Sequence, residues 1–155
     1  MNPITTVIRE ARHGPAIVAY LTAGFPSPEA FLAQLESAAA AADVVEIGVP
    51  FSDPVADGLT IQRSSRAALA QGVTLRGLLE SLANARGRFR APLLLMSYLN
   101  PLLAFGLDTL PGAARRAGIS GFIVPDLPLE ESADLGRALA RADLSLVQFV
   151  APTTP

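Results

Sequence analysis

Short apolar runs alternate with longer amphipathic stretches along most of this chain. The apolar runs are rich in β-branched and aliphatic residues and predict strands over residues 16–22, 44–49, 92–99, 122–124 and 145–150. The amphipathic stretches predict helices over residues 28–42, 60–70, 75–85, 101–117 and 130–141, with Ser27 and Thr74 as N-cap candidates. Strands that alternate with helices in this way form βα units, so the pattern predicts a parallel α/β sheet.

Parallel βα units form either a doubly wound sheet or a closed barrel. A doubly wound sheet that binds dinucleotides has a G-x-G-x-x-G turn after its first strand, whereas residues 22–26 here read TAGFP. The pattern therefore favours a (β/α)8 TIM barrel, which needs eight βα units and about 250 residues. Because this chain has 155 residues, we expect residues 1–155 to form a single, incomplete TIM-barrel domain, truncated after the fifth strand.

The composition narrows the classes of function. Half of the residues are hydrophobic and 17% are charged, which suits strands that are covered on both faces. A formal net charge of -2 without a long basic run argues against a nucleic-acid partner. The absence of cysteine excludes thiol nucleophiles and zinc–thiolate sites. No apolar run approaches the roughly 18 residues of a membrane helix, and the N-terminus lacks the apolar core of a secretory signal, so we expect a cytoplasmic protein without a membrane partner.

Two carboxylates, Glu46 and Asp57, stand where structural reasons for them are weak. Glu46 interrupts an apolar strand, and a buried charge costs several kcal/mol unless it is compensated or used. Side chains alternate along a strand, so Val45 and Ile47 are predicted to face the helices and Glu46 the barrel interior. Gly48 beside it is expected to leave room for a ligand. Asp57 lies in the following loop, on the rim where barrel enzymes keep their chemistry.

Each carboxylate also has an ordinary structural interpretation. Glu46 could be the buried partner of an arginine or of backbone amides. Asp57 precedes Gly58 and a predicted helix, so it could form a turn or an N-cap. The pattern alone leaves these alternatives open.

The segment around the carboxylates, residues 45–58, reads VEIGVPFSDPVADG and resembles the signature of the tryptophan synthase α subunit family. Further segments match this family in order: YLTAG at 20–24, IQ at 61–62, ALA at 68–70, GVT at 72–74, MSYLNP at 96–101 and VPDLPLEES at 124–132. The resemblance covers nearly the whole chain from residue 16 onward. The chain is identified on these segments as similar to that family.

The resemblance implies a lyase of tryptophan biosynthesis, which cleaves indole-3-glycerol phosphate by a retro-aldol reaction to indole and glyceraldehyde 3-phosphate. Direct cleavage at indole C3 would expel a poor carbanion, so C3 must first be protonated. By resemblance, Glu46 donates that proton and removes one from the side-chain hydroxyl, which suits a glutamate with a raised pKa. Asp57 would hold the ring N–H as an ionised carboxylate and stabilise its developing positive charge.

Other residues receive roles only through the resemblance. Tyr20, Met96 and Ile123 match positions that line the indole pocket, although each is also a normal core residue. Asp53, Asn100 and Pro128 match rim positions that face a partner β subunit, although Asp53 and Asn100 each precede a proline and are good turn formers. The family assembles as a heterotetramer of two α and two β subunits. No metal or cofactor is expected on this chain, and pyridoxal phosphate is expected only on the β subunit.

The resemblance also indicates what this chain lacks. In the family, backbone amides after the seventh and eighth strands hold the substrate phosphate, and these strands would lie beyond Pro155. We therefore assign the function to the complete protein and expect residues 1–155 alone to be inactive.

Two other kinds of function are alternatives: a different barrel enzyme that acts on a sugar phosphate, and a non-catalytic module. A Schiff-base aldolase needs a lysine, and this chain has none, while a metal-dependent epimerase needs several histidines, and the one histidine, His13, is predicted to be solvated surface. Both barrel enzymes are therefore disfavoured. The second alternative is a non-catalytic module that docks on a partner enzyme and activates it.

Overall fold

The computed structural model describes residues 2–11, 14–150 and 152, so His13 lies outside the described residues. The elements, in chain order, are α1 (Pro3–Glu10), β1 (Val18–Thr22), α2 (Pro28–Ala41), β2 (Val44–Gly48), α3 (Leu59–Ala70), α4 (Leu75–Asn84), β3 (Leu93–Met96), α5 (Leu99–Phe105), α6 (Leu110–Arg116), β4 (Ile119–Ile123), a 3-10 helix η1 (Leu129–Glu131), α7 (Ala133–Arg141) and β5 (Ser145–Val147). No helix in the described part of the chain is both long and apolar enough to cross a bilayer.

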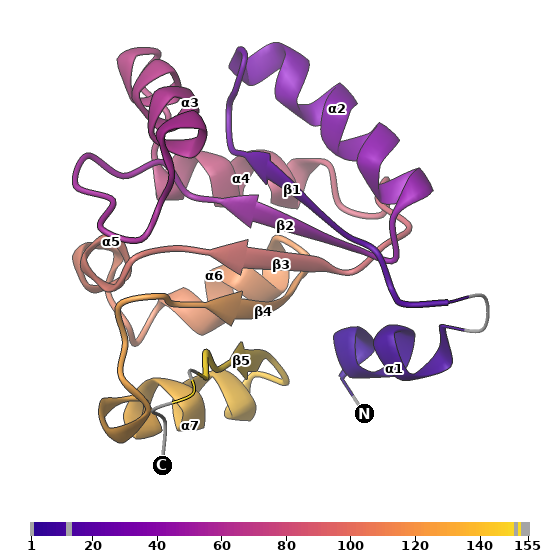
Figure 1. The fold of residues 1–155 in the computed structure, drawn as a ribbon, viewed down its shortest axis with the longest axis vertical. Helices are drawn as coiled ribbons and strands as arrows, with labels where there is room; N and C mark the ends of the chain where they lie inside the picture. Colours follow the sequence, from indigo (N-terminus) through magenta and orange to yellow (C-terminus); the bar gives the residue numbers. More distant parts are fainter. Residues whose placement is uncertain (1, 12–13, 151, 153–155) are drawn as a thin grey trace.

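The described strands form one sheet in the order β1-β2-β3-β4-β5, and every neighbouring pair is parallel (Figure 1). A doubly wound sheet reverses its strand order at a switch point, whereas this sheet adds each strand beside the one before it. The topology confirms the predicted parallel α/β sheet, and its unreversed order is that of a TIM barrel with five of its strands present.

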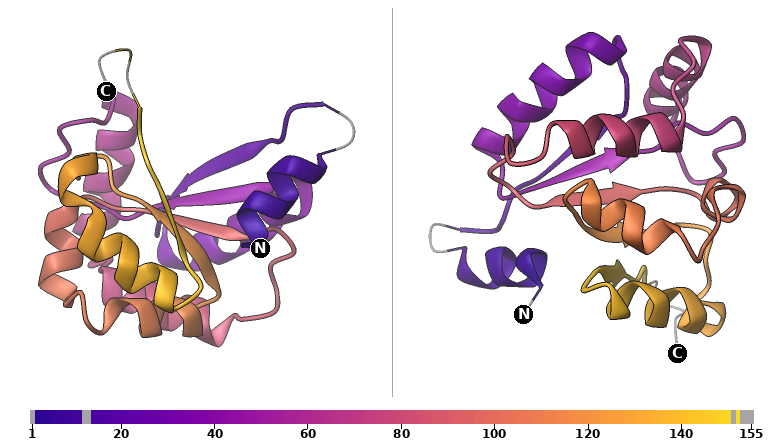
Figure 2. Two further views of the ribbon diagram at one scale, coloured as in Figure 1. Left: turned by 90° about the horizontal axis from the view of Figure 1, so that it is seen from below. Right: turned by 180° about the vertical axis from the view of Figure 1, so that it is seen from behind.

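The two faces of the sheet are covered differently. The outer face packs against α2, α4, α6 and α7 in a large apolar cluster that includes Val45, Ile47 and Phe122. The inner face carries a smaller cluster of Ile4, Val44, Leu94, Met96 and Ile123, to which α1 contributes Ile4. Figure 2 shows α1 apart from the layer of α2, α4, α6 and α7. The alternation of side chains along β2 therefore follows the predicted period of two.

Hydrogen-bonded caps fix the starts of three helices. The Ser27 hydroxyl accepts a hydrogen bond from the Ala30 N–H at 3.2 Å, and the Thr74 hydroxyl accepts one from the Gly77 N–H at 3.1 Å. Both predicted N-caps are thus confirmed. The Asn2 side chain caps α1, and its amide also donates to the Ser120 carbonyl at 2.8 Å. This second bond ties α1 to β4 across the inner face.

Several predicted boundaries are wrong. The helix predicted over residues 101–117 is two helices, because Gly106 has a φ of +103° and ends α5. The strand predicted over residues 122–124 begins at Ile119, and its Gly121 allows a close approach, since a Cβ there would lie 2.8 Å from the Ser145 carbonyl oxygen. The strand predicted over residues 92–99 ends at Met96, and the one over residues 145–150 ends at Val147.

Candidate active site

Glu46 lies on the inner face of β2. In the sheet register it stands between Tyr20 of β1 and Leu94 of β3. Its neighbours of the same parity along the strand are Val44, which belongs to the inner cluster, and Gly48. The side chain therefore belongs to the face that a barrel turns toward its interior, as the alternation predicts.

The electrostatic surroundings of Glu46 favour its protonated form. Burial raises the pKa of the Glu46 carboxyl above its ordinary value, and the nearby Asp57 charge raises it further. Among the residues that the structure describes, the ion pairs are Arg88–Glu36, Arg115–Asp143 and Arg137–Asp134, and none involves Glu46. The structural interpretation of Glu46 as the partner of an arginine thus has no support in the described part of the chain. A half-buried carboxyl with a raised pKa and no ionic partner is suited to proton transfer.

Asp57 lies in the loop of residues 49–58 that leads from the end of β2 to α3. The N-cap of α3 is Gly58, and no side chain caps that helix, so the interpretation of Asp57 as an N-cap is wrong. The loop is held on both sides of Asp57. The Ala56 N–H donates to the Tyr98 hydroxyl at 2.9 Å, and the Gln62 side-chain amide donates to the Asp57 carbonyl at 2.9 Å.

The pKa of Asp57 reflects two opposed effects. Burial raises the pKa of the Asp57 carboxyl, and hydrogen bonding to Tyr98 lowers it. The influence of Asp57 on the pKa of both Glu46 and Tyr20 indicates that the three groups share one electrostatic neighbourhood. The structure therefore brings together the two carboxylates that lie eleven positions apart in the sequence.

Tyr20 fills the space beside Gly48. A Cβ on Gly48 would lie 2.0 Å from the Tyr20 hydroxyl oxygen, so a larger residue at position 48 would have to displace the Tyr20 side chain. The expectation that Gly48 leaves room for a ligand is therefore wrong, because the Tyr20 ring occupies that room. Burial raises the pKa of Tyr20 to about 12, with further increases from the charges of Asp57 and Glu46. Its hydroxyl is accordingly protonated at neutral pH.

Met96 and Ile123 lie in the next row of the inner face. Met96 pairs with Gly48 and with Ile123 in the sheet register, and both apolar side chains are buried in the inner cluster. The structure thus places these two predicted pocket residues beside the row of Tyr20 and Glu46. They supply an apolar surface next to two polar groups, which is the usual composition of a small-molecule site.

The three predicted rim residues come from different loops. Asp53 lies between β2 and α3 and accepts a hydrogen bond from Ser52, Asn100 lies in the first turn of α5, and Pro128 follows β4. All three are exposed. They stand beyond the carboxyl ends of β2, β3 and β4, which parallel strands bring to one edge of the sheet.

Tyr98 and Gln62 contribute to the site although sequence reasoning assigned them no role. Both contact the Asp57 loop, and Tyr98 is only 1% exposed. Each lies in a segment that matches the family, MSYLNP for Tyr98 and IQ for Gln62. The polar hydroxyl of Tyr98 near the end of an apolar run was the available signal, but its partner Ala56 lies 42 positions away.

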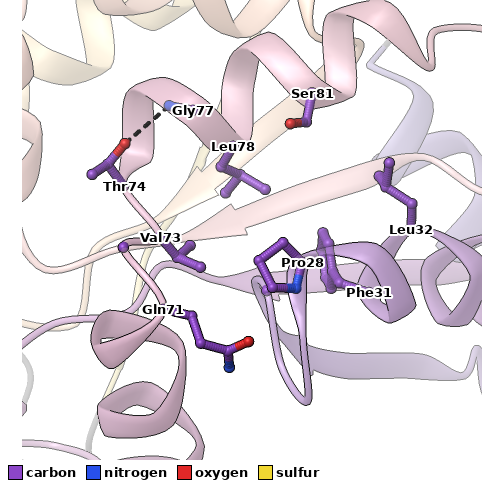
Figure 3. Close-up of a pocket in the computed structure, with 11 residues that line it drawn as sticks. Pro28, Phe31, Leu32, Gln71, Val73, Thr74, Gly77, Leu78 and Ser81 are labelled. Carbon is purple, nitrogen blue, oxygen red and sulfur yellow. Dashed lines mark hydrogen bonds between the residues drawn. The ribbon is translucent and has the colours of Figure 1, made fainter.

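A separate pocket of about 190 Å³ lies on the outer side, between α2 and α4 (Figure 3). Its walls include Phe31 and Leu32 of α2 and Val73, Leu78 and Ser81 around α4. No residue of β2 or of the Asp57 loop lines it, so it is not the site of the carboxylates. In the described part of the chain, no group of three or more histidine, aspartate or glutamate side chains is placed to hold a metal ion.

Comparison with known proteins gives consistent matches over this same region. A family model described as "Tryptophan synthase alpha chain" matches residues 8–155. A tryptophan synthase alpha chain of Nitratidesulfovibrio vulgaris is 50% identical over 150 residues, which are 95% of this chain and 58% of the relative. One of Chloroflexus aggregans is 46% identical over 159 residues, covering 100% of this chain and 60% of the relative. The chain therefore spans about three-fifths of the length of these relatives.

Solved structures agree with the sequence matches. A tryptophan synthase subunit alpha from Legionella pneumophila has a TM-score of 0.90 and 35% identity over 100% of this chain and 61% of its own. A tryptophan synthase from M. tuberculosis has a TM-score of 0.91 and 31% identity over 100% of this chain and 63% of its own. On the extent of the family model and the agreement of the fold, the chain belongs to the tryptophan synthase alpha chain family.

Proposed function

We propose that the protein containing this chain cleaves indole-3-glycerol phosphate to indole and glyceraldehyde 3-phosphate. The observation that carries the proposal is the joint placement of Glu46 and Asp57. Burial raises the pKa of both carboxyls, the Asp57 charge raises that of Glu46 further, and Glu46 lies on the inner face of the sheet without an ion pair in the described chain.

Glu46 is proposed to move both protons of the reaction. Its protonated form donates to indole C3, which makes the ring nitrogen an iminium. The resulting carboxylate then takes the proton of the side-chain hydroxyl, a carbonyl forms, and the carbon–carbon bond at C3 breaks. The electron pair of that bond neutralises the iminium and yields indole. Glu46 is protonated at the start and at the end of the reaction, and its raised pKa favours this protonated form.

Asp57 is proposed to bind the indole N–H as an ionised carboxylate. Positive charge develops on the ring nitrogen when C3 is protonated, and a fixed negative charge at that place stabilises the transition state more than the ground state. Tyr20, Met96 and Ile123 are proposed to contact the indole ring. Their apolar surface excludes water and strengthens the interaction between the carboxylate and the charged ring.

The rim is proposed to contact a β subunit. Related structures include a tryptophan synthase complex from Pyrococcus furiosus, at 34% identity and a TM-score of 0.83. Asp53, Asn100 and Pro128 are exposed at the edge where the site opens, so a partner docked there could receive the released indole. We propose a heterotetramer with a β subunit that carries pyridoxal phosphate, and a cytoplasmic location.

One test supplies the part of the relatives' length that this chain does not span. The protein used, called the completed protein, joins residues 1–155 to the part of the Nitratidesulfovibrio vulgaris relative that lies beyond the matched segment. We expect the completed protein to release indole from indole-3-glycerol phosphate and the 155-residue chain to release almost none, because anchoring of the phosphate positions the substrate. A folded completed protein without indole release would contradict the proposed function, and equal release by the short chain would contradict the need for the phosphate segments.

The alternative, a module that only activates a partner enzyme, is favoured by one observation. Val55 and Leu59, beside Asp53 on the rim, are 83% and 70% exposed, which is typical of a surface that a partner covers. Assays of the completed protein with and without a β subunit separate the two functions. Indole formation without the partner supports catalysis by this chain, whereas a response of the partner's reaction alone supports the activating module.

A further inference from the structure

We propose that Tyr98 is a positioning residue, whose buried hydroxyl fixes the peptide before Asp57 and aims the Asp57 carboxylate toward Glu46 and Tyr20. This inference rests on the proposed function of Asp57 but is carried by separate contacts. Tyr98 is the N-cap residue of α5, two positions after the end of β3, and is 1% exposed, so its hydroxyl is held inside the protein rather than in solvent. A buried hydroxyl needs partners, and those of Tyr98 lie in the Asp57 loop.

The geometry around Tyr98 leaves its ring little freedom. Its hydroxyl accepts the Ala56 N–H at 2.9 Å, and its ring packs against Phe51 with centroids 5.3 Å apart. Tyr98 therefore contacts the loop near its beginning and again just before Asp57. Next to Tyr98, the Leu99 N–H donates to the Asp126 carboxylate at 2.8 Å, which anchors the start of α5 to the loop after β4.

The Tyr98 hydroxyl can serve two partners at once. A phenol has one proton to donate and lone pairs to accept with. Because the hydroxyl oxygen accepts from Ala56, its own proton remains available to the Asp57 carboxylate. Hydrogen bonding to Tyr98 lowers the pKa of Asp57 against the effect of burial. Tyr98 therefore favours the ionised form of Asp57, which is the form that the proposed reaction requires.

The titratable groups around Asp57 come from different elements: Glu46 from β2, Tyr20 from β1 and Tyr98 from the N-cap of α5. Burial raises the pKa of Tyr98, and the charges of Asp57 and Asp126 raise it further, so Tyr98 stays protonated at neutral pH. Among these groups, hydrogen bonding to Tyr98 is what lowers the pKa of Asp57.

Gln62, in the first turn of α3, provides a matched control that contacts the same loop. Its side-chain amide donates to the Asp57 carbonyl at 2.9 Å, so it holds the main chain on the other side of Asp57. Gln62 hydrogen-bonds to the backbone of Asp57 and not to its carboxylate. Loss of the Gln62 amide should loosen the loop. Loss of the Tyr98 hydroxyl should loosen the loop and also remove a hydrogen-bond donor from the Asp57 carboxylate.

The test compares Tyr98→Phe with Gln62→Met by two readouts. The first is a carbon-13 NMR titration of the aspartate carboxyls in the 155-residue chain, with Asp57 assigned by its loss in Asp57→Asn. The second is the pH dependence of kcat/KM for indole release by the completed protein. We expect Tyr98→Phe to raise the titration midpoint of Asp57 and to move the acid limb of the profile to higher pH. Gln62→Met should lower kcat/KM severalfold without shifting the titration midpoint of Asp57 or the acid limb of the pH profile.

An unchanged Asp57 midpoint in Tyr98→Phe would overturn the inference. An equal shift in Gln62→Met would overturn it as well, because displacement of the loop would then explain the effect. The NMR titration does not depend on activity, so an inactive completed protein would refute the proposed function and leave the role of Tyr98 to be decided by the titration.

Discussion

The two faces of β2 show how one strand serves both stability and chemistry. On the outer face, Val45 and Ile47 are 0% exposed and pack beneath the helices. The residue between them, Glu46, lies on the inner face, is only partly buried and has no ion pair in the described chain. Apolar burial on the outer face stabilises the fold, whereas burial of the Glu46 carboxyl on the inner face destabilises it. Substitution of Glu46 on the inner face should therefore lower activity but not stability, whereas substitution on the outer face should lower stability but not activity.

The largest effect is expected from Glu46→Gln in the completed protein. The amide has nearly the same shape but cannot transfer the two protons, so indole release should fall by about 10²–10⁴-fold or more. The circular dichroism spectrum should be unchanged, and the midpoint of thermal unfolding should not fall. Appreciable turnover by this variant would remove Glu46 from the proposed role.

Asp57→Asn should have the next largest effect. The neutral amide cannot offset the positive charge on the indole nitrogen, and loss of such a stabilising group costs about 10²–10³-fold in kcat. Steady-state kinetics of the completed protein measure the change. A near-normal rate would show that the Asp57 charge is not needed at the ring.

Substitution on the outer face should reverse this pattern. Ile47→Ala removes a fully buried side chain and should lower the free energy of unfolding by about 2–5 kcal/mol. Denaturant titration of the completed protein measures this loss. The folded fraction should keep a kcat within a few-fold of the parent protein, and a loss of kcat as large as that of Glu46→Gln would contradict the separation of the two faces.

The smallest effect concerns the pH dependence of stability. The pKa of Glu46 is higher in the folded than in the unfolded chain, so its ionisation destabilises the fold above the folded pKa, and the penalty disappears below the unfolded pKa. Glu46→Gln should thus be more stable than the parent near pH 7, and the difference should vanish as the pH falls toward the ordinary glutamate pKa of about 4.3. Unfolding titrations at several pH values measure it, and a variant less stable at pH 7 would show that the carboxylate is compensated.

Local patterns predicted much of this structure. The alternation of Val44 to Ile47 gave the correct faces, and the Ser27 and Thr74 caps depend on neighbours three residues away. The residues missed depend on contacts between distant segments. The Tyr98 hydroxyl meets Ala56 across 42 positions, and the Tyr20 ring fills the place beside Gly48 from the neighbouring strand. No pattern within one segment specifies such pairs.

Proton transfer between Glu46 and C3 of the indole ring is the central step of the proposed reaction. Incubation of the completed protein with indole and glyceraldehyde 3-phosphate in D₂O tests this step directly, because reversible protonation replaces the C3 hydrogen with deuterium, and proton NMR follows its loss. We predict rapid exchange with the parent protein and exchange at the uncatalysed rate with Glu46→Gln. Equal exchange by the two proteins would contradict the account.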